Sequence, residues 1–170
     1  MNDSERAFAI QYLEQTRDRL LGFASSLPVD RRDFRRTETE WSPAGLIEHV
    51  IVLENIALRQ IQNATADESR RGKGAHKDRM ILEGVPARAT KVQAPEFVCP
   101  TGRWPDWDVM IGEFSGVRSR VLDFAKTSET DLRIHFAPHL FFKDLDQYQW
   151  LILIAAHCER HIRQAEEQLQ

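Results

Sequence analysis

The chain has 170 residues, of which 42% are hydrophobic and 29% are charged, with a net charge of −3. This length predicts one domain over residues 1–170, because single domains commonly span about 100–200 residues and can bury a core of their own. The small negative net charge gives no electrostatic reason to expect a nucleic-acid partner, because nucleic-acid binding normally requires a clear basic excess on one face, so we expect none.

The apolar segments are too short for a membrane protein. The longest apolar run extends from Leu151 to Ala156, whereas a membrane span requires about 20 such residues. The N-terminus lacks the basic region and apolar segment of a signal peptide. The two cysteines, Cys99 and Cys158, lie far apart and are typical of reduced thiols. We therefore expect a cytoplasmic protein with no membrane partner.

Two helices are predicted in the first half of the chain. The first extends from about Asp3 to Ser26, and its apolar residues recur at helical spacing. They are Phe8, Tyr12, Leu13, Leu20 and Phe23. The second begins after Ser42, a good N-cap, with Pro43 at its first position, and runs to about Ala64. His49 lies on the inner stripe of this second helix.

The segment from Thr65 to Pro105 is long and rich in Arg, Lys, Gly and Pro. Connections of this length are uncommon within a compact domain. We predict that the segment crosses the molecule from the second helix to the third, with a short helical turn at about Asp78 to Glu83.

Two more helices are predicted in the second half, at about Asp106–Lys126 and Asp144–Gln168. The apolar side of the third consists of Val109, Phe114, Val117, Val121 and Phe124. In the fourth, Asp144 and Gln147 form a capping-box pattern. No segment alternates like a strand, so the predicted fold class is all-α: a four-helix bundle with a long crossover loop between helices two and three.

His157 and His161 form the most informative pair in the sequence. A spacing of four places both imidazoles on one helix face, where they can bind one metal ion at about 2.0–2.1 Å each. They continue an inward stripe that consists of Trp150, Ile154, His157, His161, Gln164 and Gln168. The same spacing also fits two packing histidines with hydrogen-bond partners, and it does not name a third ligand.

Other polar groups near this pair have weaker patterns. The HCERH motif differs from the zinc-protease motif, and its Glu159 is about 200° around the helix from the first histidine, so we expect Glu159 to face solvent. Cys158 is expected to be a packing residue. His135 and His139 are also four apart, but Pro138 between them disfavours a helix.

Three segments resemble the DinB-like superfamily, which includes the YfiT-type metal-dependent hydrolases. They are WSPAGLIEHVIVLE, PTGRWPDW and PHLFFKDLDQYQWLILIAAHCERHIRQAEE, in that order, and the resemblance covers about residues 5–168. It implies a four-helix bundle that binds a divalent metal, often nickel or zinc, through one histidine of helix two and two of helix four. In this sequence the implied metal ligands are His49, His157 and His161.

The sequence departs from the family pattern before the last helix. Many relatives have His-Pro-x-x-Gly-Pro-Leu there, whereas this chain reads HLFFKDL from His139 to Leu145. The histidine is kept but the Pro and the Gly-Pro are lost. The turn into the last helix is therefore expected to differ, and a role of His139 at the site does not follow from the resemblance.

Three imidazoles leave a coordination position open, which is typical of catalytic rather than structural metal sites. An open position can accept water or a thiolate. The resemblance implies both uses: transfer reactions with a low-molecular-weight thiol such as bacillithiol or mycothiol, and hydrolysis. We therefore expect a metal-dependent enzyme with a small-molecule substrate, thiol transferase first and hydrolase as the alternative.

Two non-enzymatic alternatives stay open at this point. One is a metal-stabilised binding or stress-response module, and the other is a bundle with hydrogen-bonded histidines and no metal. The resemblance also implies a homodimer.

Overall fold

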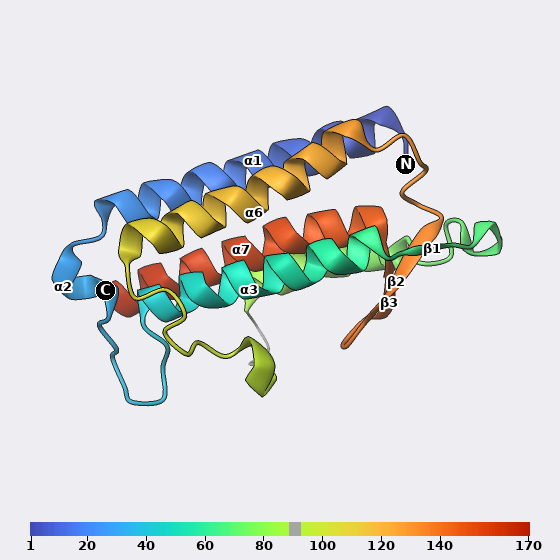
Figure 1. Ribbon diagram of the computed structural model, residues 1–170. Coiled ribbons are helices and arrows are strands. Elements are labelled where there is room, and N and C mark those ends of the chain that lie inside the picture. The colour runs from blue at the N-terminus through green and yellow to red at the C-terminus, as the bar shows by residue number, and fades with distance from the viewer. Residues whose placement is uncertain (89–92) are drawn as a thin grey trace.

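The computed structural model describes residues 1–88 and 93–170, and four long helices dominate this part of the chain (Figure 1). They are α1 (Asp3–Ser26), α3 (Pro43–Gln62), α6 (Trp107–Thr127) and α7 (Gln147–Leu169). Helix α1 packs against α6 and α7, and α3 packs against the same two helices. Helices α1 and α3 are therefore diagonal to each other, and the predicted four-helix bundle is confirmed.

Each long helix begins at a polar side chain that accepts a hydrogen bond from a first-turn N–H. These caps are Asn2, Ser42, Asp106 and Asp146. The predicted capping box at Asp144 was wrong by two residues. Asp146 accepts from the Gln149 backbone N–H at 2.8 Å, and the Gln149 side chain accepts from the Asp146 N–H at 3.1 Å. The start shifts because the residues just before Asp146 belong to a strand.

A small antiparallel sheet, which the sequence pattern did not predict, lies at the end of the bundle where α7 begins (Figure 1). Its strands are ordered β1 (Thr65–Ala66), β2 (His135–His139) and β3 (Lys143–Asp146). In the β2–β3 hairpin, Phe136 pairs with Asp146 and His139 pairs with Lys143. Strands this short show no clear alternation in sequence. The non-helical prediction for the segment around Pro138 is confirmed.

The connection from α3 to α6 crosses the bundle, as predicted, and carries several short helices. These are η1 (Glu68–Arg70), α4 (His76–Arg79), the π-helical η2 (Met80–Gly84), α5 (Val85–Ala87) and η3 (Glu96–Val98). The predicted turn at Asp78–Glu83 is confirmed as part of this run. Both η2 and α5 pack against α7. A further short helix, α2 (Val29–Arg32), lies between α1 and α3.

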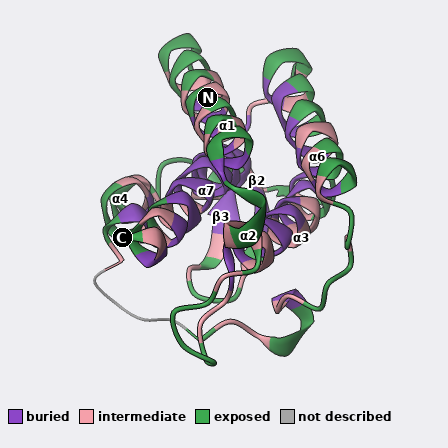
Figure 2. Ribbon diagram, turned by 90° about the vertical axis from the view of Figure 1, so that its left-hand side faces the viewer, coloured by how far each residue is buried: buried purple, intermediate pink, exposed green. Residues whose placement is uncertain are grey.

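Helix α7 lies at the centre of the core, and residues 151–156 are all buried (Figure 2). The prediction that Phe8 and Val109 lie in the core was wrong, since Phe8 is 41% exposed and Val109 is 54% exposed. Their neighbours Ala9 and Met110 are buried instead, because α1 and α6 each pack against two helices at once. Among the described residues, no helix has the length and hydropathy that a membrane span requires.

A buried ion pair also connects the bundle. The Arg118 guanidinium of α6 donates to the Glu54 carboxylate of α3, with a 3.0 Å contact from Nε. It also donates to the Leu13 carbonyl oxygen at 2.7 Å and to Thr16 Oγ1 at 2.8 Å, both in α1. One side chain therefore joins three helices.

Candidate metal centre

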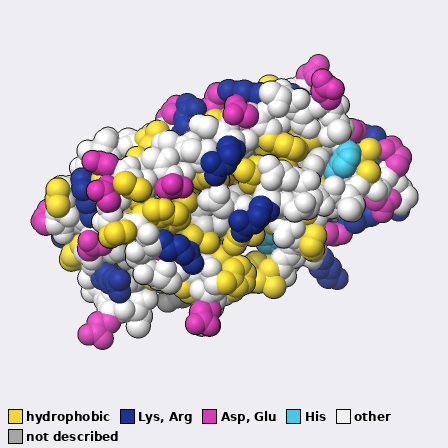
Figure 3. All heavy atoms as spheres, viewed as in Figure 1, with side chains coloured by type: hydrophobic (Ala, Val, Ile, Leu, Met, Phe, Trp, Pro, Cys, Tyr) yellow, Lys and Arg dark blue, Asp and Glu magenta, His cyan; other side chains and the backbone are white. Residues whose placement is uncertain are grey.

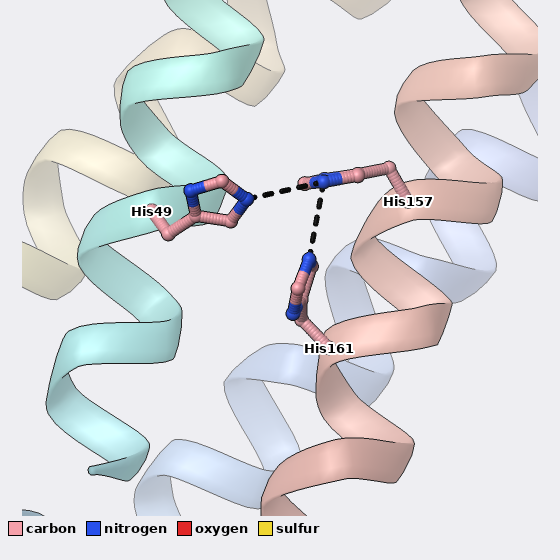
Figure 4. A group of neighbouring side chains, drawn as sticks. All are labelled: His49, His157 and His161. Atoms are coloured by element: carbon pink, nitrogen blue, oxygen red, sulfur yellow. Dashed lines mark hydrogen bonds between the residues drawn. The ribbon is translucent and has the colours of Figure 1, made fainter. Parts of the chain in front are cut away.

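Three imidazoles from two helices converge in the interior of the bundle (Figure 4). His49 comes from α3, and His157 and His161 lie one turn apart on α7. His157 Nε2 lies 3.3 Å from His49 Nε2 and 3.1 Å from His161 Nε2. Two ligands of a tetrahedral ion at 2.0–2.1 Å would be separated by about 3.3 Å. The three histidines therefore form a cluster compatible with binding one metal ion.

The outer nitrogens of two rings fix which nitrogen faces the centre. His49 Nδ1 donates to the Val98 carbonyl oxygen at 2.8 Å, and His161 Nδ1 lies 3.1 Å from Gln164 Oε1. Because carbonyl oxygens only accept, both rings are protonated at Nδ1 and direct an Nε2 lone pair inward. Metal-binding histidines are typically held in this way. Without an ion, a His157 ring protonated at Nε2 would share its one N–H between these two lone pairs, whereas an ion at the centre would accept a lone pair from all three rings, so the geometry is compatible with metal binding.

The electrostatics of the cluster favour neutral rings. His49 and His161 are buried, while His157 is partly exposed. Burial lowers the pKa of His49, and burial together with the neighbouring imidazoles lowers the pKa of both His157 and His161 well below its usual value. All three rings are therefore neutral at pH 7, and the neutral imidazole is the form that binds metals.

Sequence reasoning missed the groups that hold these rings. Any residue at position 98 would supply a backbone carbonyl, so no residue type there could have indicated this contact. Gln164 was placed on the inward stripe, and its position three residues after His161 was the available signal. The Trp41 ring also packs on His49, with 4.9 Å between ring centroids.

The second histidine pair lies outside the cluster. His139 Nδ1 accepts from the Phe141 and Phe142 backbone N–H groups at 3.1 and 3.2 Å, and its ring packs on Trp150. Burial lowers the pKa of His139 to about 4. His135 Nδ1 donates to the Asp131 carbonyl oxygen at 2.9 Å. Both residues therefore stabilise the turns around β2 and β3.

The prediction that Glu159 faces solvent was wrong. Glu159 is 7% exposed and pairs with Arg19 of α1 and Arg163 of α7. It borders a cleft of about 400 Å³ between α1, α7 and the segment 82–87, away from the histidines. The error arose because α1 covers the side of α7 opposite His157. Cys158 is fully buried, which confirms its prediction as a packing residue.

The fold and the site together define a helical bundle with a three-histidine cluster between facing helices. The family model of the DinB superfamily matches residues 12–165 of this chain. The chain therefore belongs to the DinB superfamily, as its sequence motifs predicted. No curated protein and no solved structure gives a match to it.

Proposed function

We propose that this protein is a metal-dependent enzyme that holds one divalent ion, nickel or zinc, on His49, His157 and His161. The observation that carries the proposal is the convergence of three Nε2 atoms. Two of them belong to rings whose Nδ1 donates a hydrogen bond, in His49 to the Val98 carbonyl oxygen and in His161 to Gln164 Oε1. Among the described residues, no cysteine or carboxylate joins this cluster. A divalent ion there would supply Lewis acidity and favour an anionic ligand at its open position.

Thiol transfer is the reaction that we favour, with a small-molecule electrophile as the acceptor. Hydrolysis is helped by a carboxylate base near the reacting water. The nearest carboxylates in sequence are Glu48 and Glu159, and both are engaged: Glu48 by backbone N–H groups and Glu159 by two arginines. A thiolate held by the metal requires no such base. The partial exposure of His157 also favours an accessible site over a sealed one.

Metal content tests the ligand assignment. Tag-free protein purified without chelator or nickel resin should contain about one nickel or zinc ion per chain by mass spectrometry. His157→Ala should lose it, whereas His76→Ala should not, because His76 is exposed and outside the cluster. Wild-type metal content in the folded His157→Ala protein would contradict the assignment of His157 as a metal ligand.

Paired assays separate the candidate reactions. The metal-loaded protein is given low-molecular-weight thiols with an electrophile, and separately given activated esters without thiol. We expect metal-dependent consumption of the thiol that a chelator abolishes. Ester cleavage without thiol consumption would instead identify a hydrolase. Inactivity in both assays with a full metal site would support the binding-module alternative.

A further inference from the structure

Glu48, the residue before His49, anchors a neighbouring loop to α3. It is 4% exposed. Its carboxylate accepts hydrogen bonds from the backbone N–H groups of Thr101 at 2.8 Å, Gly102 at 2.9 Å and Arg103 at 3.3 Å. Three successive N–H groups around one carboxylate form an anion-binding nest, and hydrogen bonds to a charged acceptor are among the stronger ones in proteins.

The loop, residues 96–103, is called the strap below, and its shape suits this contact. Gly102 has φ +75°, a conformation that glycine adopts without steric cost. Pro100 lies against Gly45 of α3, where an added Cβ would be 3.3 Å from Pro100 Cγ. Glycine is therefore favoured at two positions for different reasons: at Gly45 by the close approach of Pro100, and at Gly102 by the positive φ of the turn.

The strap also carries the group that orients His49. The Val98 carbonyl oxygen, three residues before Thr101, accepts the His49 Nδ1 proton at 2.8 Å. Two consecutive residues of α3 are thus linked through one loop: Glu48 holds the loop in place, and the loop holds the imidazole of His49.

We propose that Glu48 is a positioning residue of the metal centre. Through the strap it keeps His49 in the Nδ1–H tautomer, with Nε2 directed at His157. The inference rests on the proposed function where it concerns metal affinity. Groups that orient metal ligands typically contribute about 10–100-fold to that affinity.

Glu48→Gln tests the inference, because it keeps the size of the side chain and removes the negative charge to which the three backbone N–H groups donate. Zinc affinity, measured by competition with a chromophoric chelator, should weaken about 10–100-fold. In the metal-free protein, nitrogen-15 NMR of the rings should show His49 as one tautomer in wild type and as a mixture in Glu48→Gln. The matched control is Glu68→Gln, an exposed residue of η1 paired with Arg71, which should change neither.

A second variant approaches the strap from its other side. Gly102→Ala strains the turn at φ +75° while Glu48 and His49 keep their own side chains, and it should shift the zinc affinity and the His49 tautomer in the same directions as Glu48→Gln. If circular dichroism shows that Glu48→Gln does not fold, Gly102→Ala tests the inference in its place.

Unchanged affinity and a single His49 tautomer in a folded strap variant would overturn the inference. Wild-type protein that binds no metal, with a tautomer shift in the variants, would refute the proposed function and leave the positioning role standing. The two failures are therefore distinguishable.

Discussion

At the scale of single residues, Gln164 is placed to control the ring of His161. Gln164→Leu removes the oxygen that accepts the Nδ1 proton, so His161 can protonate Nε2 and lose its inward lone pair. We expect zinc affinity to fall about tenfold in this variant. Gln164→Glu, which keeps an acceptor oxygen, should retain at least wild-type affinity. Equal affinity of the Leu variant and wild type in chelator competition would contradict this role.

The two cysteines should differ sharply in reactivity. Burial raises the pKa of the Cys158 thiol from 9.0 to about 12, so it is protonated as well as inaccessible at pH 8. Cys99 in the strap is partly exposed. Iodoacetamide at pH 8 should therefore label Cys99 first, as mapped by mass spectrometry, whereas unfolded protein should be labelled at both. Early labelling of Cys158 in native protein would contradict its burial.

The same shift gives a pH dependence with a definite sign. Because the folded state favours the neutral thiol of Cys158, its contribution to stability is complete below the unfolded pKa of about 9. The contribution declines as pH rises from about 9 toward 12. The free energy of unfolding, measured in urea, should fall more steeply over this range in wild type than in Cys158→Ala.

At the scale of elements, removing one partner of the buried Glu54–Arg118 pair should lower the free energy of unfolding strongly. Replacing both partners by apolar residues should lower it much less. Arg118→Met leaves the Glu54 carboxylate buried without its cation, and we expect a loss of about 3–5 kcal/mol in the free energy of unfolding. The double variant Glu54→Leu with Arg118→Met should recover most of that loss. Lys126→Met, at an exposed pair with Glu14, should cost less than about 1 kcal/mol. Equal losses in the single and double variants would contradict the reasoning.

The start of α7 can be tested at its two candidate caps. Asp146→Ala removes the observed cap and should cost about 0.5–2 kcal/mol, more than Asp144→Ala. Asp146 also pairs with Arg133, so Asp146→Asn serves as the control: it keeps the cap and removes the charge. Asp144 pairs with Arg70 and Lys77, so Asp144→Asn is its matched control. If Asp144→Ala lost more than both Asp144→Asn and Asp146→Ala in urea unfolding, the helix would start where the sequence pattern predicted it.

Local signals predicted the helices well where they were unambiguous. Ser42 followed by Pro43 located the start of α3 to the residue. Asp-x-x-Gln, in contrast, occurs at both 144–147 and 146–149, and the pairing of β2 with β3 decides between them. The burial of Arg118 had no signal, because an arginine usually lies at the surface and its partners come from other helices.

At the scale of the whole molecule, the site could be predicted only in part. Spacing along one helix indicated His157 and His161, whereas His49 came from family resemblance, since no local pattern relates residues of α3 and α7. Residues 100–103 of the strap lie in one of the segments that resemble the family, but neither the spacing nor the resemblance indicated that the strap contacts His49. Cys99, within it, was only a lone thiol in the sequence. The face of the molecule shown in Figure 3 carries Lys and Arg side chains interspersed with Asp and Glu side chains. The expected homodimer stays a prediction.

Metal binding should stabilise the whole fold, because the ion would bind only where α3 and α7 are assembled. At a free zinc concentration of 100 times Kd, the gain is about 2.7 kcal/mol, and for a chain of this size that raises Tm by roughly 5–10 °C. Calorimetry with zinc, and then with excess chelator, should show the rise and its reversal. His157→Ala should show no rise, and a similar rise in that variant would indicate binding elsewhere.

The sequence separation of the ligands has a consequence for synthesis in the cell. His49 and His157 are 108 positions apart, and a ribosome adding 5–20 residues per second needs about 5–20 s to make that stretch. Until α7 emerges, the growing chain has only one of the three imidazoles and lacks the helix at the centre of its core. Under the proposed function, metal acquisition would therefore come late in synthesis, after α7 has emerged, and a polypeptide truncated before α7 would have only one of the three histidines.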